Sequence, residues 1–258
     1  MNCRIASLSR ILVVAAVVLL AAAPVRADVG IAKIREKADR FYQHEEWGNA
    51  LAMFRAILDR EPTDVATYGR AVTVNGVIGD TGEQLGLLEA TQRYALPLDS
   101  LFEQVRISAF ETNHPEQLEN FMVLVKTRQP WLKRNINLRL ARYYNSRNNA
   151  EKMIEMSDSL LAVNPDDPSM LRIKARGFML LDRYEVAMPI WERVVELDAT
   201  DVDAMLNIGV YYASEVEQRQ LALQSDEAEK ARRYLKMAAA LQPTDRVAQL
   251  LEKLTHRQ

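Results

Sequence analysis

The chain has 258 residues, of which 33 are lysine or arginine and 35 are aspartate or glutamate, so its formal net charge is −2. This balance does not favour a nucleic-acid-binding protein, for which a concentrated basic face is expected. A chain of this length can bury a continuous core, and its single cysteine excludes a disulfide scaffold.

The first 27 residues have the layout of a secretory signal peptide. Arg4 and Arg10 form a basic start, Ile11 to Ala23 form an apolar run of 13 residues, and residues 25–27 form a small-x-small cleavage site. A helix that spans a bilayer needs about 20 apolar residues, so this run is too short for a typical anchor. We therefore expect cleavage after Ala27 and a periplasmic or secreted mature protein. The alternative is that the segment is retained as an anchor.

Removal of this segment changes the composition of the chain. The segment contains three arginines, no acidic residue and the only cysteine, Cys3. Subtracting 3 from 33 leaves 30 basic residues against 35 acidic ones, a net charge of −5. Asp28 stands where a lipoprotein would have its cysteine. The sequence thus predicts a mature chain without a lipid anchor and without stable membrane insertion.

Prolines recur along the mature chain at a nearly constant spacing. The first gaps are 35, 33 and 35 residues, one further step lands on Ala199, and the remaining gap of 44 residues contains an insertion of ten. A period near 34 residues is typical of helical-hairpin repeats, in which each unit buries its apolar face against its neighbours. The prolines are Pro62, Pro97, Pro130, Pro165 and Pro243.

Pairs of a small residue and an aromatic ring, about one helical turn apart, precede several of these prolines. A small residue lets two antiparallel helices approach closely, and a ring one turn away fills the space that remains. Proline then ends the second helix of the unit. The clearest pairs are Ala38/Phe41, Ala50/Phe54, Ala175/Phe178, Ala187/Trp191 and Gly209/Tyr212.

This pattern of a small residue, an aromatic, an alanine, an aromatic and a terminal proline resembles the tetratricopeptide repeat. The resemblance covers nearly all of residues 31–245. It implies an all-α fold, a right-handed α-α superhelical solenoid of about six helical hairpins with a C-terminal capping helix at residues 246–258. It also implies a single domain over residues 28–258. The repeats would span residues 31–64, 65–99, 100–132, 133–167, 168–201 and 202–245.

The unit over residues 65–99 departs from the pattern. It lacks the small-plus-aromatic pairs and contains five glycines. Glycine inside a helix costs about 0.5 to 1 kcal/mol relative to alanine, so we expect this unit to be the softest part of the array. Gly79 and Gly82 are expected to form its inter-helix turn.

The unit over residues 202–245 contains the ten-residue insertion, which has strong helix formers and neither proline nor glycine. We expect both of its helices to be extended, with the second beginning after Ser225, where acidic residues complement the helix dipole. The end of this hairpin, near residues 216–228, is expected to project and to offer a surface for self-association.

The sequence contains no recognisable catalytic or metal-binding constellation. His44, His114 and His256 are scattered without the spacing of metal ligands, and the mature chain has no cysteine nucleophile. A phosphate-binding glycine loop is also missing. We therefore expect no enzymatic activity, no metal and no cofactor.

In tetratricopeptide arrays the first helix of each hairpin lines a concave groove, and the resemblance implies the same arrangement here. Several arginines occupy these places in the fourth and fifth units, and guanidinium groups match carboxylates bidentately. The alternative is that they pair with neighbouring acidic residues or extend into water. The candidate groove residues are Arg139, Arg142, Asn145, Arg172, Arg176, Met179, Leu180 and Leu206.

Arrays that clamp the acidic C-termini of cytosolic chaperones carry lysines, asparagines and an arginine along three consecutive units. The matching places at the front of this array hold Arg35, Asp39 and Arg70. Because Asp39 would repel a carboxylate, the sequence does not favour a chaperone clamp.

The function that we expect is that of a non-catalytic protein–protein interaction adaptor of the cell envelope, which binds a protein or peptide segment in its concave groove. The alternative is an envelope glycan-binding module, in which an exposed Trp47 or Trp131 stacks on a sugar ring beside arginines. Burial of both rings would argue against this alternative.

Overall fold

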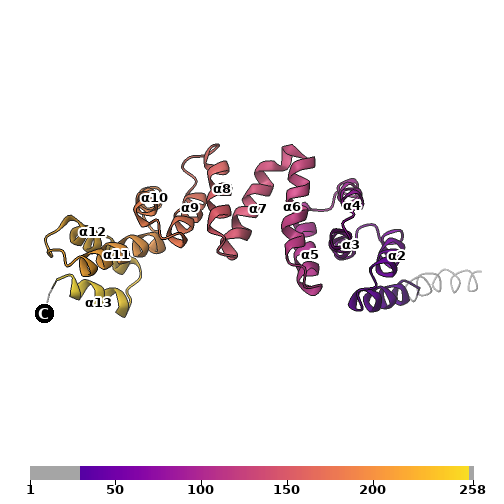
Figure 1. Cartoon of the computed structure of the whole chain (residues 1–258), viewed down its shortest axis with the longest axis horizontal. Helices are drawn as coiled ribbons and strands as arrows, with labels where there is room; N and C mark the ends of the chain where they lie inside the picture. The colour runs from indigo at the N-terminus through magenta and orange to yellow at the C-terminus, as the bar shows by residue number, and fades with distance from the viewer. Residues whose placement is uncertain (1–29, 256–258) are drawn as a thin grey trace, which may run out of the picture. The chain divides into compact units, whose positions relative to one another are not determined.

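A computed structural model describes residues 30–255 of the chain, and helices are the only regular secondary structure in that range (Figure 1). The prediction of an all-α array of helical hairpins is confirmed. The signal peptide with its cleavage after Ala27, and the last three residues of the expected cap, lie outside the described residues. The helices are residues 30–43, α2 (Trp47–Leu58), α3 (Val65–Val77), α4 (Thr81–Arg93), α5 (Leu98–Glu111), α6 (Glu116–Arg128), η1 (Pro130–Leu132), α7 (Lys133–Ser146), α8 (Ala150–Leu161), α9 (Pro168–Leu180), α10 (Tyr184–Leu197), α11 (Val202–Gln218), α12 (Asp226–Leu241) and α13 (Asp245–Lys253).

The chain divides into two compact units between Arg128 and Gln129. In the described part of unit 1 the hairpins are residues 30–43 with α2, α3 with α4, and α5 with α6. In unit 2 they are α7 with α8, α9 with α10, and α11 with α12, followed by α13. Each expected repeat thus spans two helices, while the expected single domain stays a prediction.

Unit 1 is held together by close contact between helices. Ala38, Ala50 and Phe54 are buried in the first hairpin, as the spacing of small and aromatic residues predicts. α3 packs most extensively against α5. A Cβ atom at Gly69 would lie 2.4 Å from the Cβ atom of Gln104, so only glycine fits where these helices meet. Glycine in the second repeat therefore permits the close helix contact that alanine permits in the other repeats.

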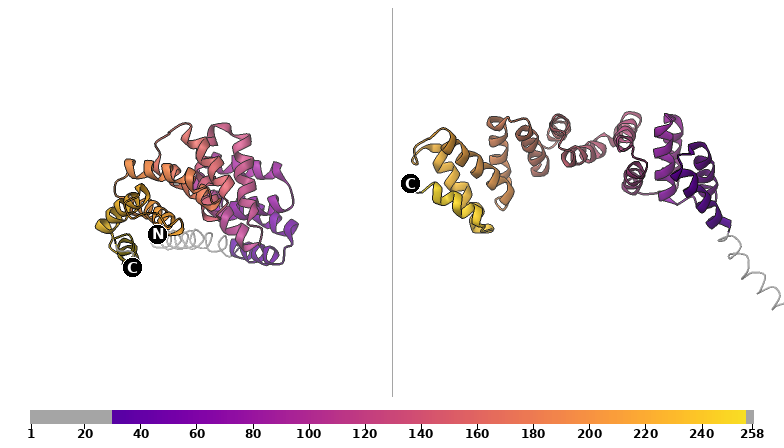
Figure 2. Two further views of the ribbon diagram at one scale, coloured as in Figure 1. Left: turned by 60° about the vertical axis from the view of Figure 1, so that its left-hand side comes forward. Right: turned by 60° about the horizontal axis from the view of Figure 1, so that its bottom comes forward.

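Unit 2 uses the same packing more regularly. Ala141, Ala175 and Ala187 are fully buried, and Trp191 is buried beside them. α11 and α12 lie side by side in Figures 1 and 2 and form the most extensive helix pair of the unit. A Cβ atom at Gly209 would lie 2.7 Å from the Cγ atom of Leu235, so glycine sets how closely α11 and α12 approach.

Each hairpin reverses direction at a residue in the left-handed backbone region, and of these reversals the sequence predicted only the one at Gly79. The φ angles of these residues lie between 51° and 82°, and their successive spacings are 34, 34, 35, 34 and 38 residues. This conformation is unfavourable for residues with a Cβ atom, although asparagine and aspartate tolerate it better than most. The residues are Glu45, Gly79, Asn113, Asn148, Asp182 and Gln220.

The glycine-rich repeat has only one of its glycines at this reversal. Gly79 turns the chain with a φ angle of 82°, whereas Gly82 lies in the first turn of α4 rather than in the inter-helix turn as expected. Asp80 explains the difference. Its side chain accepts a hydrogen bond from the Glu83 amide and caps α4, so the helix begins at Thr81 and includes Gly82.

The insertion lengthens α11 to 17 residues and α12 to 16, and a seven-residue loop joins them. The side chain of Ser225 accepts a hydrogen bond from the Ala228 amide, so the expected start of the second helix is confirmed. The extended end does not simply project, however. Val216 and Ala228 are buried in one cluster with Val247 and Leu254, so α13 covers one side of it.

Two glycines of unit 1 allow the effect of backbone conformation to be measured apart from packing. A Cβ atom would meet nothing within 4 Å at either Gly79 or Gly86. We predict that Gly79→Ala lowers the free energy of unfolding by about 1 to 2 kcal/mol, because alanine resists a positive φ angle. Gly86→Ala, inside α4, should raise it by about 0.5 to 1 kcal/mol. Urea unfolding of both variants measures this, and effects of the same sign would contradict the assignment of the turn.

Candidate interaction surface

A cleft of unit 2 lies between α9, the start of α10, α11 and α13. Its volume is about 510 Å³, and its walls are more apolar than polar. α11 forms one side of the cleft and α13 the opposite side. The side chains that dominate its lining are Met179, Tyr184, Leu206, Val210, Tyr211 and Leu250.

Aromatic contacts hold part of the lining in place. The rings of Tyr184 and Tyr211 stack with their centroids 5.5 Å apart and an interplanar angle of 16°. Burial raises the pKa of Tyr211, and nearby Glu215 adds to the effect. The buried indole of Trp191 donates a hydrogen bond of 3.1 Å to the sulfur of Met179. The cleft is therefore a preformed surface with rigid rings at its edge.

Of the candidate groove residues, Met179 and Leu206 line this cleft. Leu180 is 43% exposed and lies outside it. None of the four candidate arginines is part of its lining, which instead includes Arg246 from α13.

Arg172 is engaged inside the protein. Its guanidinium group forms ion pairs with Asp201 and, at 2.9 Å, with Asp198. Asp201 is buried, and its other carboxylate oxygen accepts a hydrogen bond from the Ala204 amide at the start of α11. Arg172 thus links α9 to the next hairpin. This is the alternative given above for the candidate arginines, in which they pair with neighbouring acidic residues.

Arg176 connects α9 to the preceding hairpin through amides. It donates hydrogen bonds to the side-chain oxygens of Asn145, at 2.8 Å, and Asn148, at 2.6 Å. Asn148 is the residue that reverses the α7–α8 hairpin. The structure therefore brings Arg176 and Asn145 together, and no carboxylate within residues 30–255 pairs with the charge of Arg176.

The remaining two arginines lie on α7. Arg139 donates a hydrogen bond of 3.0 Å to the side chain of Asn135. Arg142 is exposed, and it makes no ion pair or side-chain hydrogen bond with any other residue that the structure describes. The four arginines thus differ in role: Arg172 has two carboxylate partners, whereas Arg142 and Arg176 have none among residues 30–255.

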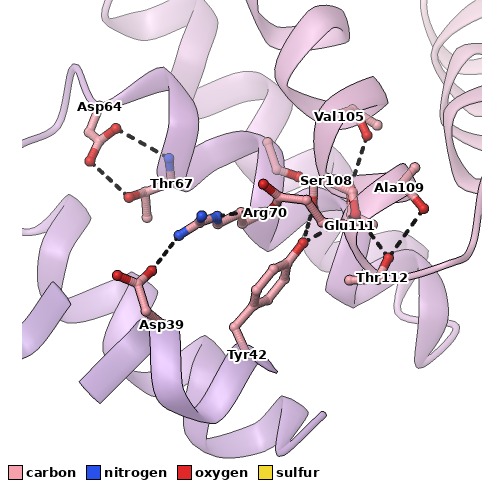
Figure 3. A network of polar contacts seen from close by, with 12 residues as sticks. Asp39, Tyr42, Asp64, Thr67, Arg70, Val105, Ser108, Ala109, Glu111 and Thr112 are labelled. Atoms are coloured by element: carbon pink, nitrogen blue, oxygen red, sulfur yellow. Dashed lines mark hydrogen bonds and ion pairs between the residues drawn. The ribbon is translucent and has the colours of Figure 1, made fainter. Parts of the chain in front are cut away.

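In unit 1 the corresponding cations are neutralised by ion pairs. Arg35 pairs with Glu61 and Asp64. Arg70 pairs with Asp39 at 2.6 Å and with Glu111 at 3.7 Å, and it lies over the ring of Tyr42 (Figure 3).

Tyr42 extends this network to α5. Its hydroxyl lies 2.7 Å from the side-chain oxygen of Ser108 and also donates to the Ser108 carbonyl oxygen at 3.2 Å. The side chain is buried, which raises the pKa of Tyr42 to about 12. This surface is a structural network that joins the three hairpins of unit 1.

The three tryptophans have different environments. Trp191 is buried in unit 2, and Trp47 is half-buried with its ring edge-on to Tyr42 at 6.0 Å. Trp131, in η1, is 75% exposed. The condition that would have argued against the glycan-binding alternative, burial of both Trp47 and Trp131, is therefore not met.

Within residues 30–255 no group of three or more histidine, cysteine, aspartate or glutamate side chains could hold a metal ion. None of the helices in that part of the chain combines the length and apolar character that a bilayer span requires.

Comparison with known proteins gives matches among solved structures alone, since no family model and no curated protein sequence matches the chain. The chain is similar to the C-terminal part of a TPR repeat-containing protein from Cytophaga hutchinsonii, with 14% identity, coverage of 84% of this chain and 99% of that one, and a TM-score of 0.40. A tetratricopeptide repeat protein from Parabacteroides merdae is 16% identical, with coverage of 88% and 99% and a TM-score of 0.36. The TPR2AB domain of yeast Sti1, in a complex with pHSP90, is 12% identical, with coverage of 88% and 98% and a TM-score of 0.35. At such TM-scores, the hairpin architecture rests on the helices and packing described above.

The different roles of two arginines can be tested by their effect on stability. We predict that Arg172→Ala lowers the free energy of unfolding by about 1 to 3 kcal/mol, because buried Asp201 loses its charged partner. Arg142→Ala should change it by less than about 0.5 kcal/mol, as expected for an exposed side chain without partners. Urea unfolding monitored by circular dichroism provides the measurement. Equal losses in the two variants would show that Arg172 is not a structural residue.

Tyr42 should make the stability of unit 1 sensitive to alkaline pH. An unperturbed tyrosine has a pKa of about 10, and Tyr42 in the folded protein has one of about 12. Its contribution to stability is therefore complete below about pH 10 and is lost as the pH rises towards about 12. We predict that Tyr42→Phe costs about 1 kcal/mol at neutral pH, through the lost hydrogen bond to Ser108, and loses less stability than the parent above pH 10. The measurement is the free energy of unfolding of both proteins as a function of pH. The same pH dependence in the two proteins would contradict this prediction.

Proposed function

We propose that this chain is a non-catalytic adaptor that binds a segment of a partner protein in the cleft of unit 2. The observation that carries the proposal is the cleft itself, a preformed concave surface of about 510 Å³ between α9, α11 and α13. Sites of this size with apolar walls and a few polar groups are typical of places that bind ligands or side chains.

The chemistry of the walls favours a peptide with apolar anchors. Leu206, Val210 and Leu250 would contact aliphatic or aromatic side chains of the segment, and the stacked Tyr184 and Tyr211 offer rigid rings. Tyrosine is enriched among the residues that contribute most to protein–protein binding, because it buries a large area at a low entropic cost. A short helix or an extended segment fits such a groove.

Acidic groups of the same segment would find cations nearby. Arg246 is part of the cleft lining, and Arg176 on α9 has amide partners but no carboxylate within the described chain. Guanidinium groups bind carboxylates through two parallel hydrogen bonds, which adds geometric selectivity. The proposed partner segment therefore combines apolar anchors with flanking acidic residues.

The remaining features of the proposal come from the sequence. The signal peptide at residues 1–27 supports export and thus a role in the cell envelope. The lack of an acid–base or nucleophile constellation supports a binding function rather than catalysis.

A glycan-binding module is the second candidate, because Trp131 presents 75% of its surface to solvent. Lys133 and Arg134 lie two and three residues after it in the sequence and are also exposed. An aromatic face beside cations suits an acidic sugar. This site would lie at the start of α7 and not in the cleft, so the two candidates can be separated by mutation.

The adaptor function is tested by blocking the cleft. Ser214 lies in the lining of the cleft on α11, and Ser214→Arg would place a long charged side chain inside it without removing an apolar contact. We predict that the chain from residue 28 onward captures a protein partner from envelope extract and that Ser214→Arg reduces its recovery by at least about tenfold, equivalent to about 1.4 kcal/mol.

The matched control is Ala199→Arg, which adds the same charge at an exposed turn between α10 and α11. This variant should recover the partner like the parent. Equal recovery by Ser214→Arg and the control would exclude the cleft as the binding site. If polysaccharide is recovered instead of protein, and Trp131→Ala abolishes its recovery, the second candidate is correct.

A further inference from the structure

Unit 2 contains a helix of one charge sign in an otherwise acidic chain. Residues 133–147 include five basic residues and no acidic one, whereas the whole chain has a net charge of −2. These residues occupy α7 and the residue that follows it. We refer to them together as the basic face: Lys133, Arg134, Arg139, Arg142 and Arg147.

The first two members of the basic face do not stabilise α7. Lys133 and Arg134 lie in the first turn, where the helix dipole disfavours positive charge, and Leu132 gives the helix no side-chain cap. By contrast, α9 and α11 begin at aspartates whose side chains accept backbone amide hydrogen bonds. The placement of these cations therefore lacks a local structural reason.

Three members of the basic face are available to a partner. Lys133, Arg134 and Arg142 are exposed, and none of them forms an ion pair or side-chain hydrogen bond with another residue of the described range 30–255. Arg139 and Arg147 flank them on the same helix and its C-terminal end. At about 100° and about 1.5 Å per residue, Arg134, Arg139 and Arg142 share one side of α7 over about 12 Å, whereas Lys133 lies on the opposite side of the helix from Arg142.

The opposite charge gathers at the other end of unit 2, where the insertion extends α11 and α12. Residues 214–229 include five acidic residues and one basic residue. Asp226 and Glu229 are exposed and have no ion pair with another residue of the described range. Glu217 has only a distant and exposed partner, Lys253 at 3.8 Å. We refer to this set as the acidic tip: Glu215, Glu217, Asp226, Glu227 and Glu229.

The two surfaces belong to different hairpins that are not neighbours in the unit. α7 packs against α8 and α9, whereas α11 packs against α10 and α12. The α9–α10 hairpin thus separates them in sequence and in packing.

We propose that the occupant of the basic face is the acidic tip of a second copy of this chain. The complementary charge is present on the same molecule, so each copy supplies both partners at equal concentration. Complementary potentials of this kind steer association and set its register. Apart from Glu215, the residues of the two surfaces lie outside the lining of the cleft, and this self-association goes beyond the adaptor function.

A contact between two different surfaces can extend into an open assembly. When each copy offers its basic face to one neighbour and its acidic tip to another, the contact is heterologous, and the assembly keeps a free basic face at one end and a free acidic tip at the other. One face of a helix about 21 Å long and about 10 Å wide buries much less than the roughly 1,200 to 2,000 Å² of a stable interface. The association should therefore be weak, electrostatic and sensitive to salt.

Sedimentation of the chain from residue 28 onward tests this proposal. At about 0.01 M salt the average mass should rise steadily with protein concentration, and at about 1 M salt it should fall to that of a monomer. Arg134→Glu with Arg142→Glu should abolish the rise, and so should Glu217→Lys with Glu229→Lys. Circular dichroism should show that both double variants keep the helical content of the parent.

Charge exchange provides the decisive measurement. A chain that carries all four substitutions has an acidic face and a basic tip, so association should return, and an equimolar mixture of the two double variants should also associate. The control Lys236→Glu changes an exposed charge on α12 outside both surfaces and should leave association unchanged.

Three results would overturn the proposal: a monomeric parent at every low-salt concentration, association that survives either double variant, or no recovery in the fourfold variant. Loss of association in the basic-face variant alone would instead indicate that α7 binds some other anion. The variant Arg134→Glu with Arg142→Glu changes no residue of the cleft lining, so it should recover the cleft partner like the parent, which separates this test from that of the adaptor function.

Discussion

Close contact between neighbouring helices, within a hairpin and between successive hairpins, is the constraint on which both units are built. At Gly69 and Gly209 the neighbouring helix comes so near that any side chain would collide with it. Small residues on the inner faces allow this approach and leave the large apolar side chains to fill the space beside them. Side chains on the outer faces are then not needed for packing between the helices. The cleft of unit 2 follows from this arrangement, because α11 and α13 both pack against α12 and leave apolar side chains on either side of the gap between them.

The hairpin architecture could be predicted because proline and small residues are tied to helix ends and helix contacts. Apart from the one at Gly79, the reversals within the hairpins could not be predicted, although they repeat more regularly than the prolines do. They are formed by glutamate, glycine, asparagine, aspartate and glutamine, so no residue type marks them. A left-handed residue is selected by the geometry of the two helices that it joins, and the helices can hold a glutamate or glutamine there at a cost of about 1 to 2 kcal/mol. Likewise, the five glycines of the second repeat predicted a unit of low stability, whereas in the structure Gly69 permits the close contact between α3 and α5.

The candidate site was less predictable, because its residues depend on partners far away in the sequence. Arg142 and Arg172 look alike as arginines on first helices. Arg172 is committed to Asp201, 29 residues away in the next hairpin, while Arg142 has no such carboxylate within reach in the described chain. Met179 and Leu206 were placed on the groove by the repeat pattern, and both line the cleft. The opposite wall, with Leu250, comes from a helix that the repeat pattern treats only as a cap.

α13 both packs against the ends of α11 and α12 and lines the cleft. The folding of the C-terminus is therefore coupled to whatever occupies the cleft. A helix of nine residues is too short to be stable alone and depends on its packing against α12 and the end of α11. A ligand that contacts Leu250 would therefore hold α13 in place and slow the hydrogen exchange of its amides. Part of the binding energy would be used to suppress local opening of this helix. The affinity of the cleft for its ligand would then depend on how cooperatively the last hairpin and α13 fold, as well as on the contacts with the ligand.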